Sequence, residues 1–312
     1  MTSFRALLTA VFIPLLLSAC TKVETVEWHM VDVNFHRGLQ GDAHVIVDNG
    51  RVALIDAGYG GPIGDRLATY ISELGIDKID KFIISHPHRD HYEGIRNVLK
   101  AGIVVEDVYY NSNTSVADCC FKADDFSEVL KLLTNQGAVI HDVHESQIIK
   151  LGKTSFRVVL AAKSSEIEGR KIDLNDVSIV MRWEAFSHSV LFAGDLNSVG
   201  GKYMADKRSI DISADILKVP HHGVTGIAPK EFFERVAPKL LMFPDPNWAR
   251  ASPRGAIAFG YASSSGVKSC SNSTNGTVKI VFRTDAVIAK PERPSATCDV
   301  GVIFSKNPSN LK

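Results

Sequence analysis

One heptapeptide constrains the fold of this chain more than any other stretch: Ser-His-Pro-His-Arg-Asp-His, from Ser85 to His91. The apolar run 82–84 before it is typical of a buried strand. The stretch 92–100 after it has apolar residues at helical spacing. The heptapeptide is therefore predicted to form a turn between the end of a strand and the start of a helix.

Four side chains of this turn are candidate metal ligands: His86, His88, Asp90 and His91. His86 and His88 are two residues apart in an extended segment and so point the same way. Asp90 and His91 begin the turn, so the segment can serve two adjacent metal positions. Imidazole and carboxylate suit zinc, with manganese or iron as alternatives. A metal-free surface cluster is the other interpretation, but burying four ionisable groups without a metal would be costly.

Composition indicates an ordinary globular protein. The 312 residues are 45% hydrophobic, and 35 basic residues balance 35 acidic ones. A net charge of zero gives no global attraction to nucleic acid, so any phosphate-binding surface must be local. Two apolar stretches, 43–48 and 51–56, flank Asn49-Gly50, which predicts a β-hairpin. No low-complexity linker interrupts the chain after residue 20, and we predict a single domain over 20–312.

The N-terminus has the pattern of an export signal. A short basic region, 1–5, precedes the apolar run 6–17, which is too short to span a membrane comfortably. It ends in Leu-Ser-Ala-Cys at Cys20, which resembles the lipobox of bacterial lipoproteins. Residues 1–19 are thus predicted to be a lipoprotein signal peptide, and a lipid on Cys20 would anchor the protein to a membrane facing the periplasm or cell surface. An ordinary secretory signal with an incidental cysteine is the alternative.

Export would place the other four cysteines in an oxidising compartment: Cys119, Cys120, Cys270 and Cys298. Four cysteines allow three pairings. The adjacent Cys119 and Cys120 can form only a strained bridge with each other, so we expect separate partners or free thiols. A Cys270–Cys298 bridge would tie down the C-terminal region. None of the four has a ligand-like spacing.

The spacing His-x-His-x-Asp-His resembles the signature of the metallo-β-lactamase superfamily. Two later stretches extend the resemblance: 191–195, an apolar run ending in Gly-Asp, and 216–223, which ends in Pro-His-His-Gly. Helices alternate with strands in the first half and further strands follow, which favours mixed sheets with outer helices. The expected fold class is α/β, an αββα sandwich of two mixed β-sheets with outer helices, the metallo-β-lactamase fold.

The resemblance also implies roles for later residues. Asp195 is expected to bridge two metals, and His221 to be the last histidine ligand. His222 would then contact substrate or support the site, although the order of the two histidines could be reversed. Asp56 corresponds to an aspartate that supports the metal loop by hydrogen bonds rather than binding metal.

One superfamily histidine between the first signature and Gly-Asp is missing. At its place stands Asn-Asp-x-Ser, at 175–178. This stretch, with Leu-Lys-Val-x-His-His-Gly at 217–223 and Gln-Gly-Asp-Ala at 40–43, resembles the hydrolase domain of the competence protein ComEC and its freestanding relatives. Asp176 could replace the histidine as an oxygen ligand, or could merely cap a turn. The expected ligands are His86, His88, Asp195 and Asp176 for the first metal, and Asp90, His91, His221 and Asp195 for the second.

These expectations define a binuclear metal-dependent hydrolase using a metal-bound hydroxide, with two Zn²⁺ ions or, alternatively, Mn²⁺. Asp90 would also steer or accept a proton. The ComEC-like branch is associated with DNA handling, so a phosphodiester, nucleic-acid-like substrate is favoured. The alternatives are a periplasmic β-lactam or lactone hydrolase acting on a small molecule, and a non-catalytic surface binding module. The missing histidine argues against a β-lactamase. No protein partner can be inferred.

Overall fold

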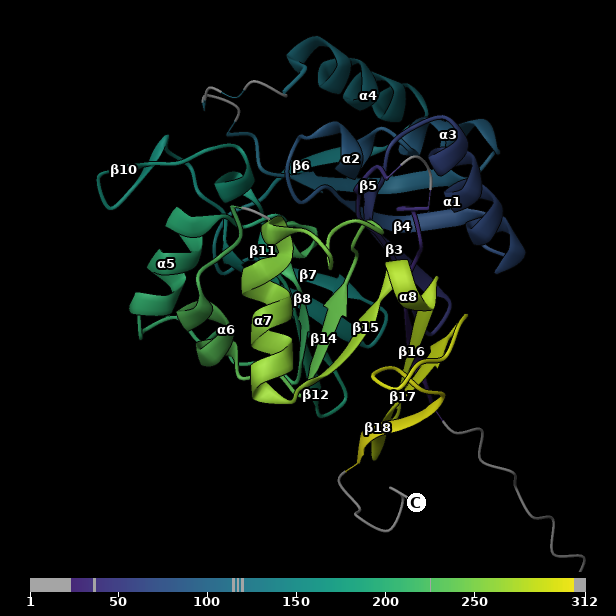
Figure 1. Cartoon of the computed structure of the whole chain (residues 1–312). Coiled ribbons are helices and arrows are strands. Elements are labelled where there is room, and N and C mark those ends of the chain that lie inside the picture. Colours follow the sequence, from purple (N-terminus) through teal and green to yellow (C-terminus); the bar gives the residue numbers. More distant parts are fainter. Residues whose placement is uncertain are drawn as a thin grey trace, which may run out of the picture.

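The computed structural model describes residues 24–35, 38–113, 116, 118, 121–224 and 226–305. The predicted signal segment 1–19, Cys20, Cys119 and Cys120 lie outside these residues. Two large sheets dominate the fold, and helices lie on their outer sides (Figure 1). Among the described residues, no helix is both long enough and apolar enough to span a membrane.

The first sheet has nine strands in the order β18-β17-β16-β1-β2-β3-β4-β5-β6. Strands β3 to β6 are parallel, and the remaining neighbours pair antiparallel. The bounds are β1 (Val26–Met30), β2 (Ala43–Asp48), β3 (Arg51–Ala57), β4 (Lys78–Ile83), β5 (Val104–Tyr110), β6 (Val139–Asp142), β16 (Val278–Phe282), β17 (Ala286–Pro291) and β18 (Gly301–Ser305). The predicted hairpin is the β2–β3 connection, where Asn49 and Gly50 have φ of 51° and 76°.

The second sheet has seven strands in the order β15-β14-β13-β12-β11-β8-β7. Strands β12 to β15 are parallel, so their carboxyl ends share one edge. The bounds are β7 (Ile148–Leu151), β8 (Thr154–Leu160), β11 (Val180–Ala185), β12 (His188–Phe192), β13 (Ile216–Lys218), β14 (Leu240–Phe243) and β15 (Lys268–Ser271). A small hairpin pairs β9 (Glu166–Ile167) with β10 (Arg170–Lys171).

Helices connect the parallel strands and cover the outer faces of both sheets (Figure 1). The bounds are α1 (Pro62–Glu73), α2 (Arg89–Tyr92), α3 (Ile95–Lys100), α4 (Ala123–Asn135), α5 (Ser198–Asp206), α6 (Lys230–Val236), α7 (Ala256–Ser265) and α8 (Asn272–Asn275), with 3₁₀ turns η1 (Asn175–Val177), η2 (Pro220–Gly223) and η3 (Pro253–Gly255). Apolar residues of α1, α3 and α4 pack on the first sheet, and those of α5, α6 and α7 pack on the second. These are the outer layers of the predicted αββα sandwich.

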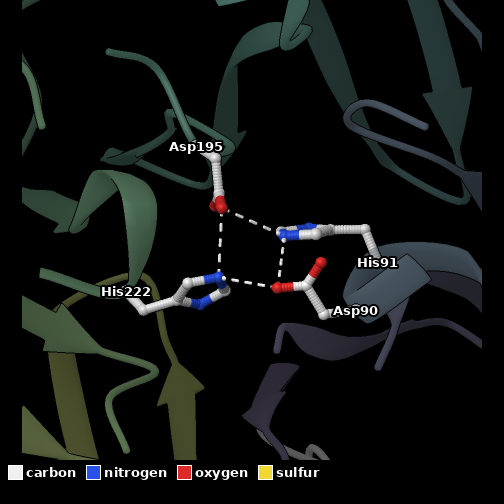
Figure 2. Close-up of side chains that lie close together, drawn as sticks. All are labelled: Asp90, His91, Asp195 and His222. Atoms are coloured by element: carbon white, nitrogen blue, oxygen red, sulfur yellow. Dashed lines mark hydrogen bonds and ion pairs between the residues drawn. The ribbon is translucent and has the colours of Figure 1, made fainter. Parts of the chain in front are cut away.

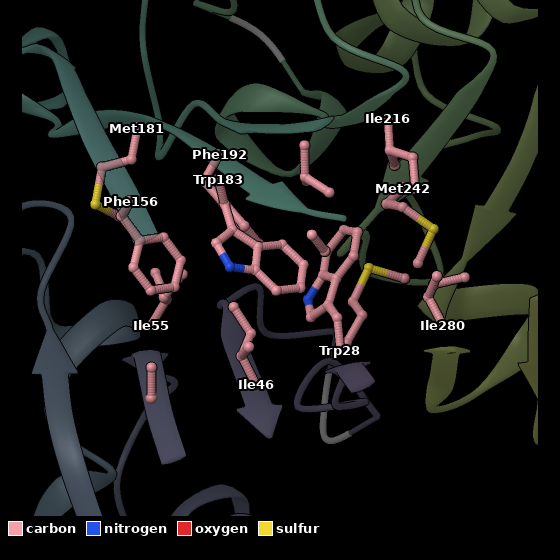
Figure 3. Packing of buried hydrophobic residues seen from close by; sticks show 14 of the residues in the cluster. Trp28, Ile46, Ile55, Phe156, Met181, Trp183, Phe192, Ile216, Met242 and Ile280 are labelled. Atoms are coloured by element: carbon pink, nitrogen blue, oxygen red, sulfur yellow. The ribbon is translucent and has the colours of Figure 1, made fainter. Parts of the chain in front are cut away.

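The two sheets face each other across one apolar core (Figure 3). Trp28 of the first sheet packs edge-on against Phe192 of the second, with ring centroids 5.0 Å apart. Trp183 and Phe282 make an equivalent contact at 5.1 Å. Alternate residues of each strand point into this core, which buries large rings on both sheets. The fold class expected from the sequence is therefore confirmed.

A disulfide joins Cys270 on β15 to Cys298, which precedes β18. Because β15 belongs to the second sheet and β18 to the first, the bridge links the two sheets near the C-terminus. This is the bridge that the sequence predicted would tie down the C-terminal region.

Candidate metal centre

The heptapeptide 85–91 forms the turn from β4 to α2, as predicted. His88 is the N-cap of α2 and has extended backbone, so Asp90 and His91 lie in the first helical turn. Asp195 follows β12, and η2 follows β13. The site is therefore built at the carboxyl ends of strands from both sheets, where parallel strands deliver their loops to one edge.

Asp90, His91, Asp195 and His222 form a buried cluster (Figure 2). Each residue offers one ligand atom, and the four atoms lie within 4.8 Å of one another. Asp195 Oδ2 is 3.2 Å from His91 Nε2 and 3.0 Å from His222 Nε2. Asp90 Oδ2 lies 3.4 Å from His222 Nε2. Two carboxylates and two imidazoles at this spacing form a donor set suited to a divalent transition metal.

Both imidazoles of the cluster are held from behind by carboxylates. Asp56 Oδ2 accepts a hydrogen bond from His91 Nδ1 over 2.9 Å, and Asp56 Oδ1 accepts one from the Ser85 amide over 2.7 Å. Asp42 Oδ1 accepts from His222 Nδ1 over 3.0 Å. Because Nδ1 donates in this way, Nε2 is the nitrogen of each ring that can bind a metal, which would displace the Nε2 proton. Asp56 makes the hydrogen bonds expected of a supporting residue, whereas the contact of Asp42 escaped the sequence analysis.

Lys218 is the only charged residue of β13, and it is buried beneath the cluster. Its Nζ donates to the Gly194 carbonyl over 2.7 Å and pairs with the Asp42 carboxylate. It also lies 3.6 Å from Asp195 Oδ1. A lone lysine in an otherwise apolar strand was the available sequence signal, because a buried ammonium needs a buried anion.

The electrostatics of the cluster favour a cation. Burial alone would lower the pKa of His91 and His222, but the neighbouring carboxylates, Asp195 foremost, outweigh it and raise both pKa values well above the usual range. Burial would raise the pKa of Asp195, but His222 and His91 hold it well below its ordinary value. Asp195 Oδ1 makes no hydrogen bond to the described residues. Charged carboxylates around facing imidazoles fit a divalent metal ion.

His86 and His88 lie beside this cluster as a facing pair. His86 Nε2 and His88 Nδ1 are 2.9 Å apart, and the His86 and His91 ring centroids are 4.2 Å apart. Of the other ring nitrogens, His86 Nδ1 lies 3.1 Å from Ser85 Oγ in a hydrogen bond, and His88 Nε2 lies 3.2 Å from Asp118 Oδ1 as an ion pair. Within the described chain, no third ligand atom joins both histidines at metal-site spacing. The predicted first metal set of His86, His88, Asp176 and Asp195 is therefore not among the candidate groups of the described residues, and its assignment stays a prediction.

Asp176, on η1, is not among the residues of the cluster. Its Oδ1 accepts the amide hydrogens of Asn197, over 3.0 Å, and Gly200, over 2.9 Å, at the start of α5. Burial raises its pKa to about 7. These contacts make Asp176 a cap for α5 in place of the metal ligand that the resemblance implied, since the amides of a helix start need acceptors.

The structure brings His222, and not His221, into the cluster of four. Both residues have left-handed backbone, with φ of 48° for His221 and 53° for His222, so the chain turns sharply between them. Such a conformation is costly for a side chain with a Cβ and is typical of functional sites. His221 Nδ1 is instead hydrogen-bonded to Asn197 Oδ1 over 2.8 Å, which puts His221 next to the cluster. The geometry thus favours the reversed order of the two histidines.

Comparison with known proteins points to the same superfamily as the fold and the buried cluster. The family model of the metallo-beta-lactamase superfamily matches residues 36–118. The chain is 25% identical over 182 residues to ComE operon protein 3 of Bacillus subtilis (strain 168), covering 58% of this chain and 22% of that protein. It therefore spans less than a quarter of that relative's length.

Solved structures with the same fold are much more distant in sequence. YhfI of Bacillus subtilis superposes with a TM-score of 0.53 at 12% identity, over 86% of this chain and 100% of YhfI. CmlA, a diiron β-hydroxylase from Streptomyces venezuelae, has the same TM-score and identity over 84% of this chain and 55% of CmlA. At this identity the likeness shows the fold alone, so function is argued from the site.

The layered fold and the buried Asp/His cluster, a candidate metal site, support a metal-dependent hydrolase. The chain thus has the metallo-β-lactamase fold, matches the model of that superfamily over residues 36–118 and is related in sequence to ComE operon protein 3.

Proposed function

We propose that this protein is a metal-dependent phosphodiesterase. The observation that carries the proposal is the cluster of Asp90, His91, Asp195 and His222, with both imidazoles oriented by buried carboxylates. A divalent metal bound there would supply a water of lowered pKa and polarise the phosphoryl group. The four side chains would hold the ion, and Asp42 and Asp56 orient the two imidazoles so that each Nε2 faces the cluster.

The charges around the cluster support a second metal position. Four carboxylates are buried there, those of Asp42, Asp56, Asp90 and Asp195, against the single buried ammonium of Lys218. One divalent ion leaves this group still negative, which would repel an anionic substrate. A second divalent ion beside His86 and His88, which supply two of the ligand atoms that it would need, would make the site positive overall. Burial lowers the pKa of His86 well below its usual value, so this imidazole is neutral and suited to bind metal.

A phosphodiester substrate is favoured because the motifs resemble the ComEC-like branch, which is associated with DNA handling. Zinc suits the mixed imidazole and carboxylate donors, and manganese is the alternative. The second candidate is hydrolysis of a lactone or β-lactam, which uses the same metal chemistry. The third is a surface module that binds metal without turnover.

The test is an assay of the purified protein, with bound metals quantified, against a phosphodiester, a phosphomonoester, a lactone and a β-lactam. Phosphodiester hydrolysis that is lost in Asp195→Ala and kept in His144→Ala is the expected result. His144 is the matched control because it is exposed and its Nδ1 bonds only to the Glu145 carbonyl. Preference for a lactone or β-lactam, or metal binding without hydrolysis, overturns the proposed substrate.

The cellular setting belongs to the same proposal. The N-terminal sequence supports export, cleavage before Cys20 and a lipid anchor on that residue, with residues 20–312 as one hydrolase domain facing the periplasm or cell surface. An exported phosphodiesterase would meet nucleic acid from outside the cell.

A further inference from the structure

A cavity of about 500 Å³ lies between helix α1 and strands β16 and β17 of the first sheet. Four residues on one face of the helix form one side of it: Arg66, Thr69, Tyr70 and Glu73. The strand side is formed by Thr277, Lys279, Lys290, Pro291 and Glu292. None of these residues belongs to the metal cluster. The volume is within the range of small-molecule pockets, roughly 300–1,000 Å³, so the cavity is a candidate binding site apart from the metal centre.

A fixed ion pair closes one end of this cavity. Arg66 Nη2 lies 3.5 Å from Glu292 Oε2, which joins the helix side to the strand side. Arg66 Nε donates to the Asp32 carbonyl over 2.9 Å, and its guanidinium carbon lies 5.0 Å from the Phe35 ring centroid. Glu292 Oε2 accepts the Thr277 amide over 3.0 Å. Because both partners are held by other contacts, a ligand has to use the rest of the cavity.

Opposite charges line the other end. Lys290 lies two strand positions from Glu292, about 7 Å, and Glu73 lies two helical turns from Arg66, about 10 Å. Lys290 and Glu73 are exposed, and neither forms an ion pair with another residue of the described ranges. Lys290 also stands directly opposite Lys279 in the β16–β17 register, and facing like charges destabilise a sheet. Within the described chain, this end thus presents a cation on the strand side and an anion on the helix side, both without a countercharge.

The hydrogen-bonding character of Tyr70 is set by His29, which is fully buried beside it. His29 Nδ1 lies 2.7 Å from the Tyr70 hydroxyl, and His29 Nε2 lies 3.2 Å from Glu27 Oε2. The hydrogen bond from His29, aided by Lys279, lowers the pKa of Glu27 to about 2, so this carboxylate only accepts. In a neutral imidazole, Nε2 therefore carries the proton, and Nδ1 accepts the proton of Tyr70. The Tyr70 oxygen is left with lone pairs for a ligand that donates.

We propose that this cavity binds a small zwitterion, a molecule with one ammonium group and one carboxylate, such as a free amino acid or a short peptide. The ammonium lies against Glu73 and the Tyr70 oxygen, and the carboxylate lies against Lys290. Such a ligand brings both countercharges, whereas a simple anion would meet Glu73 and a simple cation would meet Lys290. This site is separate from the metal centre and does not depend on the proposed hydrolase function.

Calorimetric titration of the purified protein tests the ligand class. Alanine, dialanine and trialanine are the probes, and their ranking shows whether an amino acid or a peptide fits. N-acetyl-dialanine lacks the ammonium and dialanine amide lacks the carboxylate, so each should bind about 10-fold more weakly than dialanine, as expected for losing a hydrogen bond to a charged group. No binding of any of the three probes, or equal affinity for blocked and free dialanine, overturns the proposal.

An amino acid or peptide could also bind a metal, so the location needs its own test. Asp195→Ala removes a residue of the metal cluster and should leave dialanine affinity unchanged. Loss of binding in this variant would put the ligand at the metal centre and overturn the proposal.

Two substitutions of exposed residues test the contacts with little risk to folding. Lys290→Met and Glu73→Gln remove one charge each at similar size, and each should weaken dialanine binding about 10-fold. In Lys290→Met, dialanine and its amide should bind equally well, because the partner of the carboxylate is gone. In Glu73→Gln, dialanine and N-acetyl-dialanine should likewise become equal. Lys268→Met is the matched control, since Lys268 is an exposed strand lysine outside the cavity. Unchanged affinity in Lys290→Met or in Glu73→Gln overturns the proposal.

Discussion

Asp42 and His222 are 180 positions apart in the sequence, yet Asp42 Oδ1 accepts a 3.0 Å hydrogen bond from His222 Nδ1. The same carboxylate pairs with the buried Lys218. Asp42 therefore sets which nitrogen of His222 carries the proton, and Lys218 keeps Asp42 charged and in place. The orientation of one histidine of the cluster thus depends on a residue outside the cluster of four.

Asp42→Asn should weaken metal binding about 10- to 100-fold, because the neutral amide no longer holds His222 with Nε2 towards the cluster. Competition with a chelating dye measures the affinity. Asp80→Asn is the matched control: Asp80 is also buried, but it pairs with Arg51 at 2.7 Å on β3 and β4. Metal affinity equal to wild type in Asp42→Asn would show that the Asp42–His222 contact is dispensable.

His222→Ala should remove most of the bound metal and abolish hydrolysis, since it deletes one of the four ligand atoms of the cluster. His221→Ala should keep the metal of this cluster, because His221 is hydrogen-bonded to Asn197 and is not one of the four residues of the cluster. Elemental analysis of both purified variants measures this difference. Loss of metal in His221→Ala, with retention in His222→Ala, would show that His221 is the ligand, as the sequence analysis expected.

Asp176 should make stability depend on pH. Burial raises its pKa from an ordinary value of 3.8 to about 7, so the folded protein holds this proton more tightly than the unfolded chain does. The resulting stabilisation, at most about 4 kcal/mol, is present below about pH 4 and is lost as pH rises through about 7. Asp176→Asn keeps an acceptor for the α5 amides but does not titrate. Urea unfolding across this range should show a flatter pH dependence in the variant; an identical slope would contradict the assignment.

The Cys270–Cys298 bridge closes a loop with a sequence separation of 28. Removing it in a Cys270→Ser/Cys298→Ser variant should lower the free energy of unfolding by about 3 kcal/mol, since the unfolded chain regains loop entropy. Urea denaturation with and without reductant measures the change. Wild type should lose stability on reduction and the double variant should not. Equal sensitivity of both proteins to reductant would mean that the loss of stability on reduction does not come from the Cys270–Cys298 bridge.

Cys20→Ser should release the protein from the membrane fraction, because a lipid on that residue is the proposed anchor. Fractionation and mass spectrometry of the N-terminal peptide measure the change. An unmodified peptide in wild type, with unchanged membrane association in the variant, would rule the anchor out.

The parts of the site that sequence analysis anticipated are those set by local pattern. The strand before residue 85 and the helix after it follow from apolar periodicity, so the turn carrying His86 to His91 could be placed. Asn49-Gly50 determines its own turn geometry. Asp56 was expected to support the metal loop, and it does so through Ser85 and His91.

The parts that escaped depend on tertiary contacts or on backbone angles. Which of the two adjacent histidines joins the cluster is decided by left-handed φ values in η2, and residue spacing does not encode those. The Asp176 carboxylate is chemically suited to bind a metal. In the structure, however, its Oδ1 accepts hydrogen bonds from the amides of Asn197 and Gly200 at the start of α5. Asp42 and Lys218 acquire their roles only when the two sheets pack together.

The origin of the four ligand atoms has a thermodynamic consequence. Asp90 and His91 follow a strand of the first sheet, and Asp195 and His222 follow strands of the second. Unfolding that separates the sheets dismantles the site, so metal occupancy and sheet packing are linked equilibria. An ion present at a hundred times its dissociation constant would add about 2.7 kcal/mol to the free energy of unfolding. The metal concentration in the surroundings would then affect the folded fraction of the protein as well as its activity.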